Sequence, residues 1–592
     1  MHNKQSPLRY YILAASVVVF LLVVTGGMLR ASESGGACLD WPTCFGRWTP
    51  PQGNAFLDYT HRMITALTLL FVLGAAWAAR RYAKADGWLR GLVYSTLGIL
   101  VLQILMGAWI SMNQEVFDWL SSLHLGLSLL MLGGLVAATV RAFDLRFTFS
   151  YASPFARLSL VTLAALALLL VSGGVVASTG AAQACPDWPL CNGLNLPASP
   201  AAWLNMLHRS IVLGTGLLVA ALTRRAWISQ RSQTSVLVAT TTLGVLFFAQ
   251  ALMGARLVDG FPPHLLVLHQ TSAAASWAVT VVQVTLVGMA GRSVEDERLE
   301  AQTARGRMRL VKDFLMLTKP IVVALLLVTT YAGMVIGAKS WPSAELAFWT
   351  LLGGFMAAGG SGAINQYIDR SDDQKMQRTQ NRPIPAGRLT PGEGLAFGVG
   401  MALASFYLVA ALVNFLAALL TLAGIIYYVL IYSLLLKKTT VQNIVIGGGA
   451  GAIPPLVGWA AATGSLNIPS LFLFAVVFMW TPPHFWALAL VRRVDYARAG
   501  VPMLPVVRGE VETRWQIFVY TLELVGLTLF LPLFGLGGSV YMVGAIALGA
   551  WLLWAAWKVW KQGGNRVAWK MYRYSSMYLA FLFVVLMVDA LV

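Results

Sequence analysis

The chain has 592 residues, of which 58% are hydrophobic and only 11% are charged, and its mean hydropathy is +0.70. A soluble domain contains roughly 25% charged residues, so this composition excludes a soluble globular protein, a disordered chain and a DNA-binding domain. Because a membrane-spanning helix needs about 20 apolar residues, we expect about 17 spans and an all-α polytopic membrane protein.

The net charge of +18 would suggest a nucleic-acid partner in a soluble chain, but the positive-inside rule explains it here. With the N-terminus inside and an odd number of spans, the outer basic residues are Arg30, Arg47, Arg62, Arg209, Arg256 and Lys339. We therefore expect a multi-pass protein of the cell (inner or plasma) membrane. Its N-terminus lies inside, its C-terminus lies outside, the bilayer surrounds it, and it has no nucleic-acid partner.

The pattern of apolar segments predicts two units joined by a charged linker. Residues 1–291 hold roughly eight expected spans and residues 313–592 roughly nine. Residues 292–312 between them include the most charged stretch of the chain. This composition suits an exposed inner tether, so we expect two membrane proteins fused into one chain.

The first unit is an internal duplication, with repeats at about 10–150 and 156–291. Four elements recur at one offset of 147 residues: a Cys-x-Asp-Trp-Pro-x-Cys loop, a double glycine, a His-Arg pair and a Gln-x-Leu-Met-Gly-Ala stretch. Their first copies begin at Cys38, Thr25, His61 and Gln103, and their second copies at Cys185, Ser172, His208 and Gln250. Because each repeat has an even number of spans, we expect two four-helix bundles of the same orientation.

The four cysteines all lie in the two outer loops of the first unit. An outer, oxidising location favours two disulfides within the loops, Cys38–Cys44 and Cys185–Cys191. Free thiols or a redox couple are the alternative. A zinc site is disfavoured, because the loops belong to different bundles and have no neighbouring histidine cluster.

Four histidines occupy repeated positions at the outer ends of spans, namely His61, His124, His208 and His269. Two imidazoles at equal depth on facing helices are what bis-His haem ligation requires. A hydrogen-bonded packing residue is the alternative for an isolated membrane histidine. The repeated pattern therefore predicts that these side chains ligate haem iron.

This arrangement of spans, cysteine pairs and histidines resembles haem A synthase, which oxidises a methyl group of haem O to a formyl group. The resemblance covers the whole first unit. It implies that His61 and His124 flank a substrate haem, and that His208 and His269 hold a b-type cofactor haem.

The acid before the first histidine differs from the usual pattern of that family, because Asp58 replaces the usual Glu in Asp58-Tyr-Thr-His61-Arg62, and Asn205 holds the matching place in the second repeat. The resemblance implies a catalytic role for Asp58, with a helix-start residue as the alternative. It also implies that Arg62 and Arg209 contribute to haem binding.

A polar cluster follows a glycine-rich span in the second unit. Asn365, Asp369 and Asp373 are four residues apart, so they share a face if the helix continues. Carboxylates crowded at a membrane boundary favour a bound Mg²⁺, which also binds phosphate oxygens. The basic residues that follow, among them Arg370, Arg378 and Arg382, complete the composition of a diphosphate site.

Three further segments resemble protohaem IX farnesyltransferase, a family of the intramembrane prenyltransferase superfamily. They are Leu317-Thr-Lys319-Pro, the stretch 432–455 that begins Tyr432-Ser-Leu-Leu-Leu-Lys437, and the stretch 481–505, which begins Thr481-Pro-Pro-His484-Phe-Trp and ends Asp495-Tyr-x₂-Ala-Gly-x-Pro-Met-Leu-Pro505. The catalytic residues that this resemblance implies are Asn365, Asp369, Asp373, Lys319, Tyr432, Lys437, His484 and Asp495. The substrate-binding residues that it implies are Arg370, Arg378, Arg382, Arg492 and Arg493.

Two of these assignments have stated alternatives. Tyr432 and His484 are expected on the porphyrin side, with ordinary packing at a helix end as the alternative. A second Mg²⁺ near Asp495 is in doubt, because Ala499 stands where the superfamily often has another acid.

Together the two resemblances imply a bifunctional enzyme that converts haem B and farnesyl diphosphate to haem O, and haem O to haem A. Its cofactors would be bis-His haem b and Mg²⁺, and its partners an electron donor and the assembly of a terminal oxidase. Two other functions stay open. The first unit could be a di-haem electron-transfer or haem-carrier protein, and the second could prenylate another aromatic acceptor.

Overall fold

The computed structural model describes residues 7–32, 36–38, 40–84, 86–113, 118–144, 149–193, 195–290 and 306–592, and these residues form helices and loops without a β-strand. Among them, 17 helices are long and apolar enough to cross a membrane. The all-α, polytopic fold predicted from the composition is therefore confirmed. The chain divides into two compact units, residues 1–303 and 304–592.

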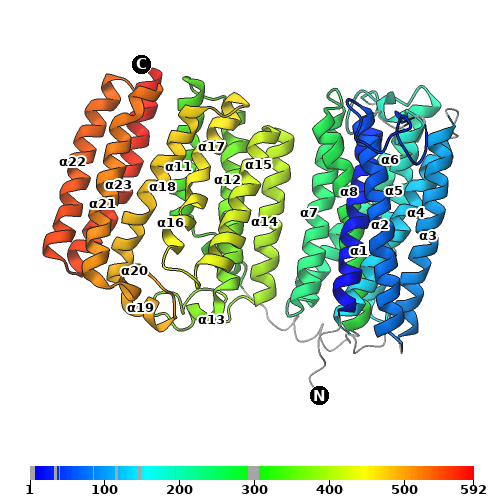
Figure 1. Ribbon diagram of the computed structural model, residues 1–592, viewed down its shortest axis with the longest axis horizontal. Helices are drawn as coiled ribbons and strands as arrows, with labels where there is room; N and C mark the ends of the chain where they lie inside the picture. The colour runs from blue at the N-terminus through cyan, green and yellow to red at the C-terminus, as the bar shows by residue number, and fades with distance from the viewer. Residues whose placement is uncertain are drawn as a thin grey trace. The chain divides into compact units, whose positions relative to one another are not determined.

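The first unit contains eight spanning helices, coloured blue to green in Figure 1. They are α1 Leu8–Ala31, α2 Ala55–Tyr82, α3 Gly87–Met112, α4 Asp118–Phe143, α5 Pro154–Ser178, α6 Pro200–Ser229, α7 Thr234–Leu257 and α8 Pro263–Ala290, with a short 3₁₀ helix, η1, at Ala181–Ala184. His264, which the topology predicts to lie in a loop, is in the first turn of α8 instead.

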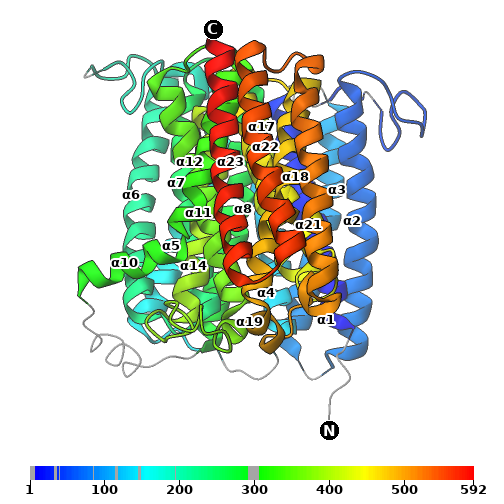
Figure 2. The ribbon, with the colours of Figure 1, turned by 90° about the vertical axis from the view of Figure 1, so that its left-hand side faces the viewer.

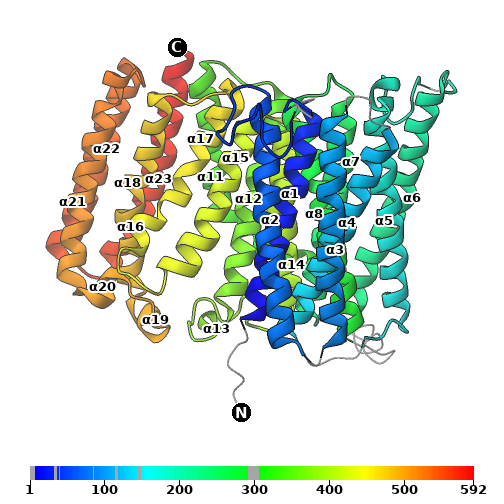
Figure 3. The same cartoon turned by 45° about the vertical axis from the view of Figure 1, so that its right-hand side comes forward.

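Helices α1–α4 form one bundle and α5–α8 form the second. In each bundle the first helix packs against the second and the fourth, so the two repeats have the same internal arrangement (Figure 3). Helix α4 packs against α5 and α8, and α1 packs against α8, which joins the bundles. This confirms the two four-helix repeats that the 147-residue offset predicts.

The second unit contains the other nine candidate spans and several short helices at their ends. Its elements are α10 Arg307–Leu317, α11 Pro320–Ala338, α12 Ala344–Ile368, α13 Arg370–Asp373, α14 Pro391–Leu412, α15 Phe415–Ile426, η2 Tyr427–Leu436, α16 Asn443–Gly447, α17 Gly449–Thr463, α18 Ile468–Val491, α19 Arg493–Arg498, α20 Leu504–Val507, α21 Gly509–Phe530, η3 Leu531–Phe534, α22 Ser539–Gln562 and α23 Asn565–Leu591. Of the predicted linker, residues 292–305 lie outside the described part of the chain, and residues 307–312 form the first turns of α10.

Helix packing in the second unit places its short helices at one end. Helices α18, α21, α22 and α23 pack side by side (Figure 2) around a core that includes Trp480, Tyr541 and Phe583. Helices α13, α19 and α20 lie at the same end of this unit, below the long helices in Figure 1. The polar residues carried by these short helices of the second unit therefore lie at one end of its apolar bundle.

Helices α11 and α17 approach closely through glycine. A Cβ at Gly458 would lie 1.8 Å from the carbonyl oxygen of Thr330, whereas a Cβ at Gly451 on the same helix would meet nothing within 4 Å. Only the absence of a side chain at Gly458 allows this close approach, as in other tightly packed membrane helix pairs.

We expect Gly458→Ala to lower the stability of the second unit by about 1–3 kcal/mol, because the methyl group must push α11 and α17 apart. Thermal unfolding of the purified full chain in detergent would measure this loss. Gly451→Ala is the matched control and should be neutral or slightly stabilising. Equal transitions for the two variants would contradict the close approach of the helices.

Candidate functional site

Each of the four repeated histidines faces a glycine on a neighbouring helix. A Cβ added to Gly26 would lie 3.2 Å from Cε1 of His61, and one added to Gly173 would lie 3.2 Å from Cε1 of His208. Gly107 and Gly254 face His124 and His269 in the same way, at 3.7 and 3.4 Å. The glycines of the repeated motifs therefore provide the space in which the imidazole rings lie.

A hydroxyl group sets the tautomer of two of these rings. The Oγ1 of Thr25 lies 3.3 Å from Nδ1 of His61 and donates its own proton to the carbonyl of Leu22. Ser172 repeats the arrangement, at 2.8 Å from Nδ1 of His208. A hydroxyl has one proton. When that proton goes to the backbone carbonyl, Nδ1 of the histidine donates its hydrogen to the hydroxyl oxygen, which leaves a lone pair on Nε2. That is the form in which imidazole binds a metal.

The other two histidines have unpaired ring nitrogens. Nδ1 of His124 and Nδ1 of His269 are buried and have no hydrogen-bond partner. Gln103 and Gln250, at matching positions, donate to the backbone carbonyls of these two residues at 2.6 and 2.7 Å. His61 on α2 and His124 on α4 belong to the first bundle, and His208 on α6 and His269 on α8 belong to the second. These pairings fit the predicted haem ligand sets, since each pair offers two imidazoles from two helices.

The second glycine of each double glycine joins one repeat to the other. A Cβ at Gly27 would lie 2.7 Å from Oε1 of Gln270, the residue after His269. A Cβ at Gly174 would lie 2.9 Å from a methyl group of Leu125, the residue after His124. Each Gly-Gly pair thus contacts a histidine of its own repeat and the helix turn that carries a histidine of the other.

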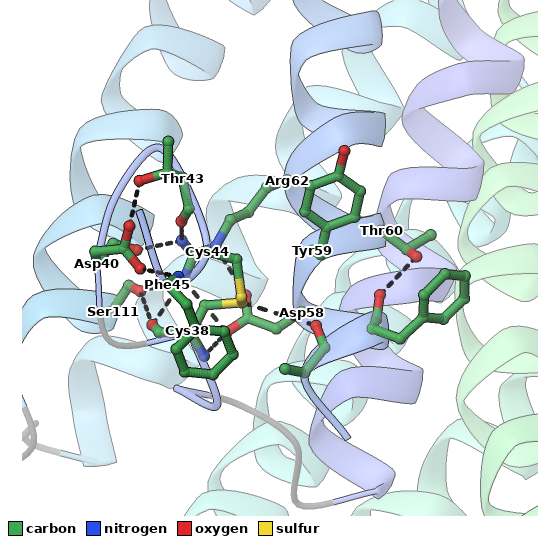
Figure 4. The surroundings of a disulfide bond; sticks show 12 residues. Cys38, Asp40, Thr43, Cys44, Phe45, Asp58, Tyr59, Thr60, Arg62 and Ser111 are labelled. Carbon is green, nitrogen blue, oxygen red and sulfur yellow. Dashed lines mark hydrogen bonds and ion pairs between the residues drawn. A yellow bond between two sulfur atoms is a disulfide. The ribbon is translucent and has the colours of Figure 1, made fainter. Parts of the chain in front are cut away.

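The first disulfide loop is held by an ion pair at the start of α2 (Figure 4). Cys38 and Cys44 form the expected disulfide. Nε of Arg62 lies 2.9 Å from Oδ1 of Asp58, and the backbone N–H of Cys38 donates to Oδ2 of Asp58 at 3.1 Å. Both carboxylate oxygens of Asp58 are therefore engaged, and its side chain is buried.

The guanidinium group of Arg62 is fully used by this loop. It donates to the backbone carbonyls of Asp40, Thr43 (2.5 Å) and Cys38 (3.0 Å) and to the hydroxyl of Ser111 (2.6 Å). Asp40 in turn accepts from the Thr43 hydroxyl and from the Gly46 N–H, and these hydrogen bonds lower the pKa of Asp40. Arg62 positions the loop, and its haem contact stays a prediction.

The second loop repeats this design with a neutral residue. Cys185 and Cys191 form the second expected disulfide. Asn205 accepts from Nε of Arg209 at 2.8 Å and donates to the carbonyls of Ala181 and Ala182. Arg209 donates to backbone carbonyls of its loop, including that of Asp187 at 2.6 Å. The amide of Asn205 both accepts a hydrogen bond and donates to carbonyl groups, whereas the carboxylate of Asp58 can only accept.

The polar cluster of the second unit is centred on Asn365. Nζ of Lys319 donates to Oδ1 of Asn365 at 2.7 Å, and the amide of Asn365 donates to Oδ2 of Asp369 at 2.8 Å. Lys437 forms an ion pair with the same Oδ2. Burial, followed by the charges of Arg382 and Lys437, lowers the pKa of Lys319 to about 7.

The other two acids of the segment have their own cations. Arg382 donates to Oδ2 of Asp373 at 2.7 Å, and Lys438 lies 2.5 Å from Oδ2 of Asp372. Helix α12 ends at Ile368 and α13 begins at Arg370. The backbone N–H groups of Asp369 and Asp373 nevertheless donate to the carbonyls of Asn365 and Asp369, at 2.9 and 2.8 Å, so the three residues keep the helical i, i+4 relation.

The predicted Mg²⁺ ligands fit a hard cation by their chemistry. Oδ1 of Asp369 is buried and has no hydrogen-bond partner, and Mg²⁺ prefers carboxylate oxygens together with those of a phosphate. No three His, Cys, Asp or Glu side chains of the described residues are grouped as a metal site. Oxygen atoms of a bound diphosphate would therefore have to complete the coordination around Asn365, Asp369 and Asp373.

The remaining predicted residues of this unit lie in several places. Arg370 stacks on Tyr367, Arg493 pairs with Glu510, and Arg378 is exposed without an ion pair to any described residue. Arg492 and Asp495, on either side of the start of α19, are half-buried.

His484 lies inside an aromatic stack. Its ring is 4.2 Å from that of Trp480 and 4.5 Å from that of Tyr572, and its Nδ1 is 2.7 Å from Oγ of Ser575. The Ser575 hydroxyl also lies 2.9 Å from the carbonyl of Tyr572. When its proton goes to that carbonyl, Nδ1 of His484 donates to Oγ and Nε2 has the lone pair. The hydroxyl thus orients this ring as Thr25 orients His61.

Sequence reasoning missed the contribution of η2, a π-helix. It brings the hydroxyl of Tyr428 to 3.3 Å from Nζ of Lys319 and Oγ of Ser433 to 3.2 Å from Nδ2 of Asn365, and it ends just before Lys437. The predicted Tyr432 lies on the same element, its ring 5.5 Å from that of Tyr428. Nothing in the apolar run of η2 signals a change of helical period, although such changes are frequent at functional sites.

Comparison with known proteins identifies both units. Residues 9–55 and 52–281 match the cytochrome oxidase assembly protein family, and residues 326–582 match the UbiA prenyltransferase family. The protoheme IX farnesyltransferase of Chloroflexus aurantiacus is 35% identical over 584 residues, which cover 96% of each chain. That of Roseiflexus sp. (strain RS-1) is 40% identical over 489 residues, covering 80% of this chain and 88% of the relative. The chain belongs to the protoheme IX farnesyltransferase family.

The predicted fusion is thus confirmed: a unit of the haem A synthase type precedes a prenyltransferase unit, and the chain is a membrane enzyme of haem biosynthesis. The protoheme IX farnesyltransferase of Gloeobacter violaceus, 48% identical, covers 52% of this chain and 99% of its own. Among solved structures, a UbiA homologue from Archaeoglobus fulgidus bound to GPP and Mg²⁺ is 18% identical, with a TM-score of 0.38, covering 46% of this chain and 99% of its own.

We expect Arg62→Ala to speed chemical reduction of the Cys38–Cys44 disulfide about 10–100-fold, because hydrogen bonds to a charged group that hold the loop are lost. Mass spectrometry of differentially alkylated peptides would follow both disulfides in one sample. Cys185–Cys191 is the internal control, and Arg47→Ala, an exposed residue of the same loop, is the matched variant. Unchanged reduction of Cys38–Cys44 would show that Arg62 does not hold the loop.

Proposed function

We propose that the chain is a bifunctional enzyme that makes haem A from haem B in two steps. The second unit joins farnesyl diphosphate to haem B to form haem O, and the first unit oxidises a methyl group of haem O to a formyl group. The observation that supports this proposal is that one chain combines four equivalent membrane histidines with the Lys319–Asn365–Asp369–Lys437 cluster. The fusion would raise the local concentration of a poorly soluble intermediate.

Farnesyl transfer uses the positive charge of the cluster. The bond from farnesyl C1 to the diphosphate oxygen breaks, and its electron pair leaves with the diphosphate. Lys319, Lys437 and Arg382 stabilise that developing charge. A vinyl group of haem B supplies the electron pair for the new bond to C1, and water then adds to the resulting cation and releases a proton. Mg²⁺ held by Asn365, Asp369 and Asp373 would further neutralise the leaving diphosphate.

The first unit divides its histidines between substrate and cofactor. His61 and His124 hold the substrate haem O, and His208 and His269 hold a b-type haem, which supplies one-electron redox chemistry. Asp58 acts on the substrate side through the loop that it and Arg62 order. A di-haem electron-transfer protein would have the same ligand sets, but the fusion with a unit that makes haem O favours oxidation of that product. Oxidation of the methyl group would take two successive hydroxylations, each using one O₂ and two electrons and two protons from an electron donor and its medium and releasing one water. Loss of a further water from the resulting diol leaves the formyl group. Haem A would then serve terminal oxidases.

The Asp369→Ala variant tests the first step. We expect haem O synthesis to fall about 10²–10³-fold, because the leaving diphosphate loses its electrostatic support. The variant should still convert supplied haem O to haem A. Chromatography of haems B, O and A measures both steps, with Glu345→Gln, an exposed acid in the first turn of α12, as the control. Normal haem O formation would contradict the diphosphate site, and failure to convert supplied haem O would contradict the independence of the units.

The His269→Ala variant tests the cofactor site. We expect the purified protein to lose its b-type haem, since the iron loses an axial ligand, whereas His61→Ala should retain this haem and accumulate haem O. The absorption spectrum and haem chromatography report these two outcomes. His264→Ala, on the same helix, is the matched control. Full b-type haem in His269→Ala would exclude this ligand set.

We also propose that the N-terminus lies inside and the C-terminus outside, because most basic residues then lie on the inner side. Both disulfide loops would face outward. A membrane-impermeant reductant added to intact spheroplasts should reduce both disulfides, and protection of both until lysis would indicate the opposite orientation.

A further inference from the structure

Arg30 lies in the last turn of α1, close to the helix turn that carries His124. Its Nη2 donates to the backbone carbonyl of Ser121 at 3.3 Å, on α4 one turn before His124. The guanidinium group therefore lies next to the site that the proposed function assigns to the substrate haem.

This guanidinium group has no anionic partner among the described residues. Nη1 of Arg30 is buried and forms no hydrogen bond, and the carbonyl of Ser121 is the single acceptor that Arg30 contacts in the described part of the chain. Arg30 as a whole is half-buried, and a cation whose donor atoms are partly removed from water is stabilised when a negative group pairs with it. The arrangement is therefore incomplete without an anion.

Arg62, the other arginine of this region, has no hydrogen-bond donor left for such an anion. Arg62 is already bound to Asp58, to three loop carbonyls and to Ser111. The second repeat has Ala177 at the position that matches Arg30, 147 residues later. The unpaired cation is therefore specific to the first repeat.

We propose that Arg30 binds a carboxylate of the porphyrin that occupies the His61–His124 site, an inference that rests on the proposed function. A haem carries two propionate groups on one edge of the ring. A guanidinium group pairs with a carboxylate through two parallel hydrogen bonds, and Nη1 of Arg30 is free to donate one of them. Arg30 thereby selects the substrate porphyrin by its acidic edge and sets its orientation between the two histidines.

The experiment is a binding titration of the purified full chain in nanodiscs, with ferric protoporphyrin IX and its dimethyl ester as probes. The absorption change that His61→Ala abolishes defines the substrate site, and the His208–His269 site is the internal reference. We expect Arg30→Gln to weaken binding of the free acid at the substrate site about 10–100-fold and Arg30→Lys to weaken it less. The wild type and Arg30→Gln should bind the dimethyl ester with equal affinity. Arg256→Gln, an outer arginine that pairs with Asp259 at 2.7 Å, is the matched control and should bind like the wild type.

Several outcomes would overturn the inference. One is that Arg30→Gln binds the free acid with wild-type affinity. Another is that Arg30→Gln loses as much affinity for the dimethyl ester as for the free acid. A third is that Arg30→Gln changes only the amount of phospholipid that co-purifies with the protein and leaves porphyrin binding unchanged. The wild type provides a test that does not depend on folding of a variant, since it should prefer the free acid to the ester. Absence of any His61-dependent site in the wild type would instead contradict the proposed function itself.

Discussion

Hydrocarbon cannot solvate charge, so a functional ion of this chain needs a partner, either within the protein or on a bound ligand. Asp58 and Arg62 pair at the start of α2, and the Lys319–Asn365–Asp369–Lys437 cluster lies where α12 ends and α11 begins. The pairs allow charge to be placed at helix ends without water. Catalytic chemistry then becomes feasible at these ends, because a leaving diphosphate or a porphyrin carboxylate can join a prearranged set of charges.

Glycine decides how closely the helices of both units approach. In the first unit, Gly26 and Gly173 leave room for histidine rings, while Gly27 and Gly174 contact the turn that carries a histidine of the other repeat. A larger residue at any of these positions would push an imidazole or a helix away. In each repeat the first glycine of the pair leaves room for a histidine ring, and the second allows close packing against a helix of the other repeat.

The two repeats share one plan and differ where their chemistry should differ. Each has a hydroxyl that orients a histidine and a glutamine that binds the backbone of another. The acid Asp58 and the unpaired cation Arg30 occur in the first repeat alone, with Asn205 and Ala177 at the matching positions. A permanently bound cofactor needs a stable site, whereas a substrate must be recognised and released, and the charged residues are found on the proposed substrate side.

The sequence by itself determined the number of spans, the duplication, both disulfides and the fusion, because these depend on composition and on spacing along the chain. It also placed the four histidines and the Asn365–Asp369 pair in the correct elements. Only the tertiary structure decided that Arg62 is bound by its loop and by Ser111, whereas Arg30 has no anionic partner among the described residues. It also decided that a π-helix brings Tyr428 and Ser433 to the cluster. Those outcomes depend on which side chain of a neighbouring helix fills each hydrogen-bonding position, and spacing along one chain does not specify which helices face each other.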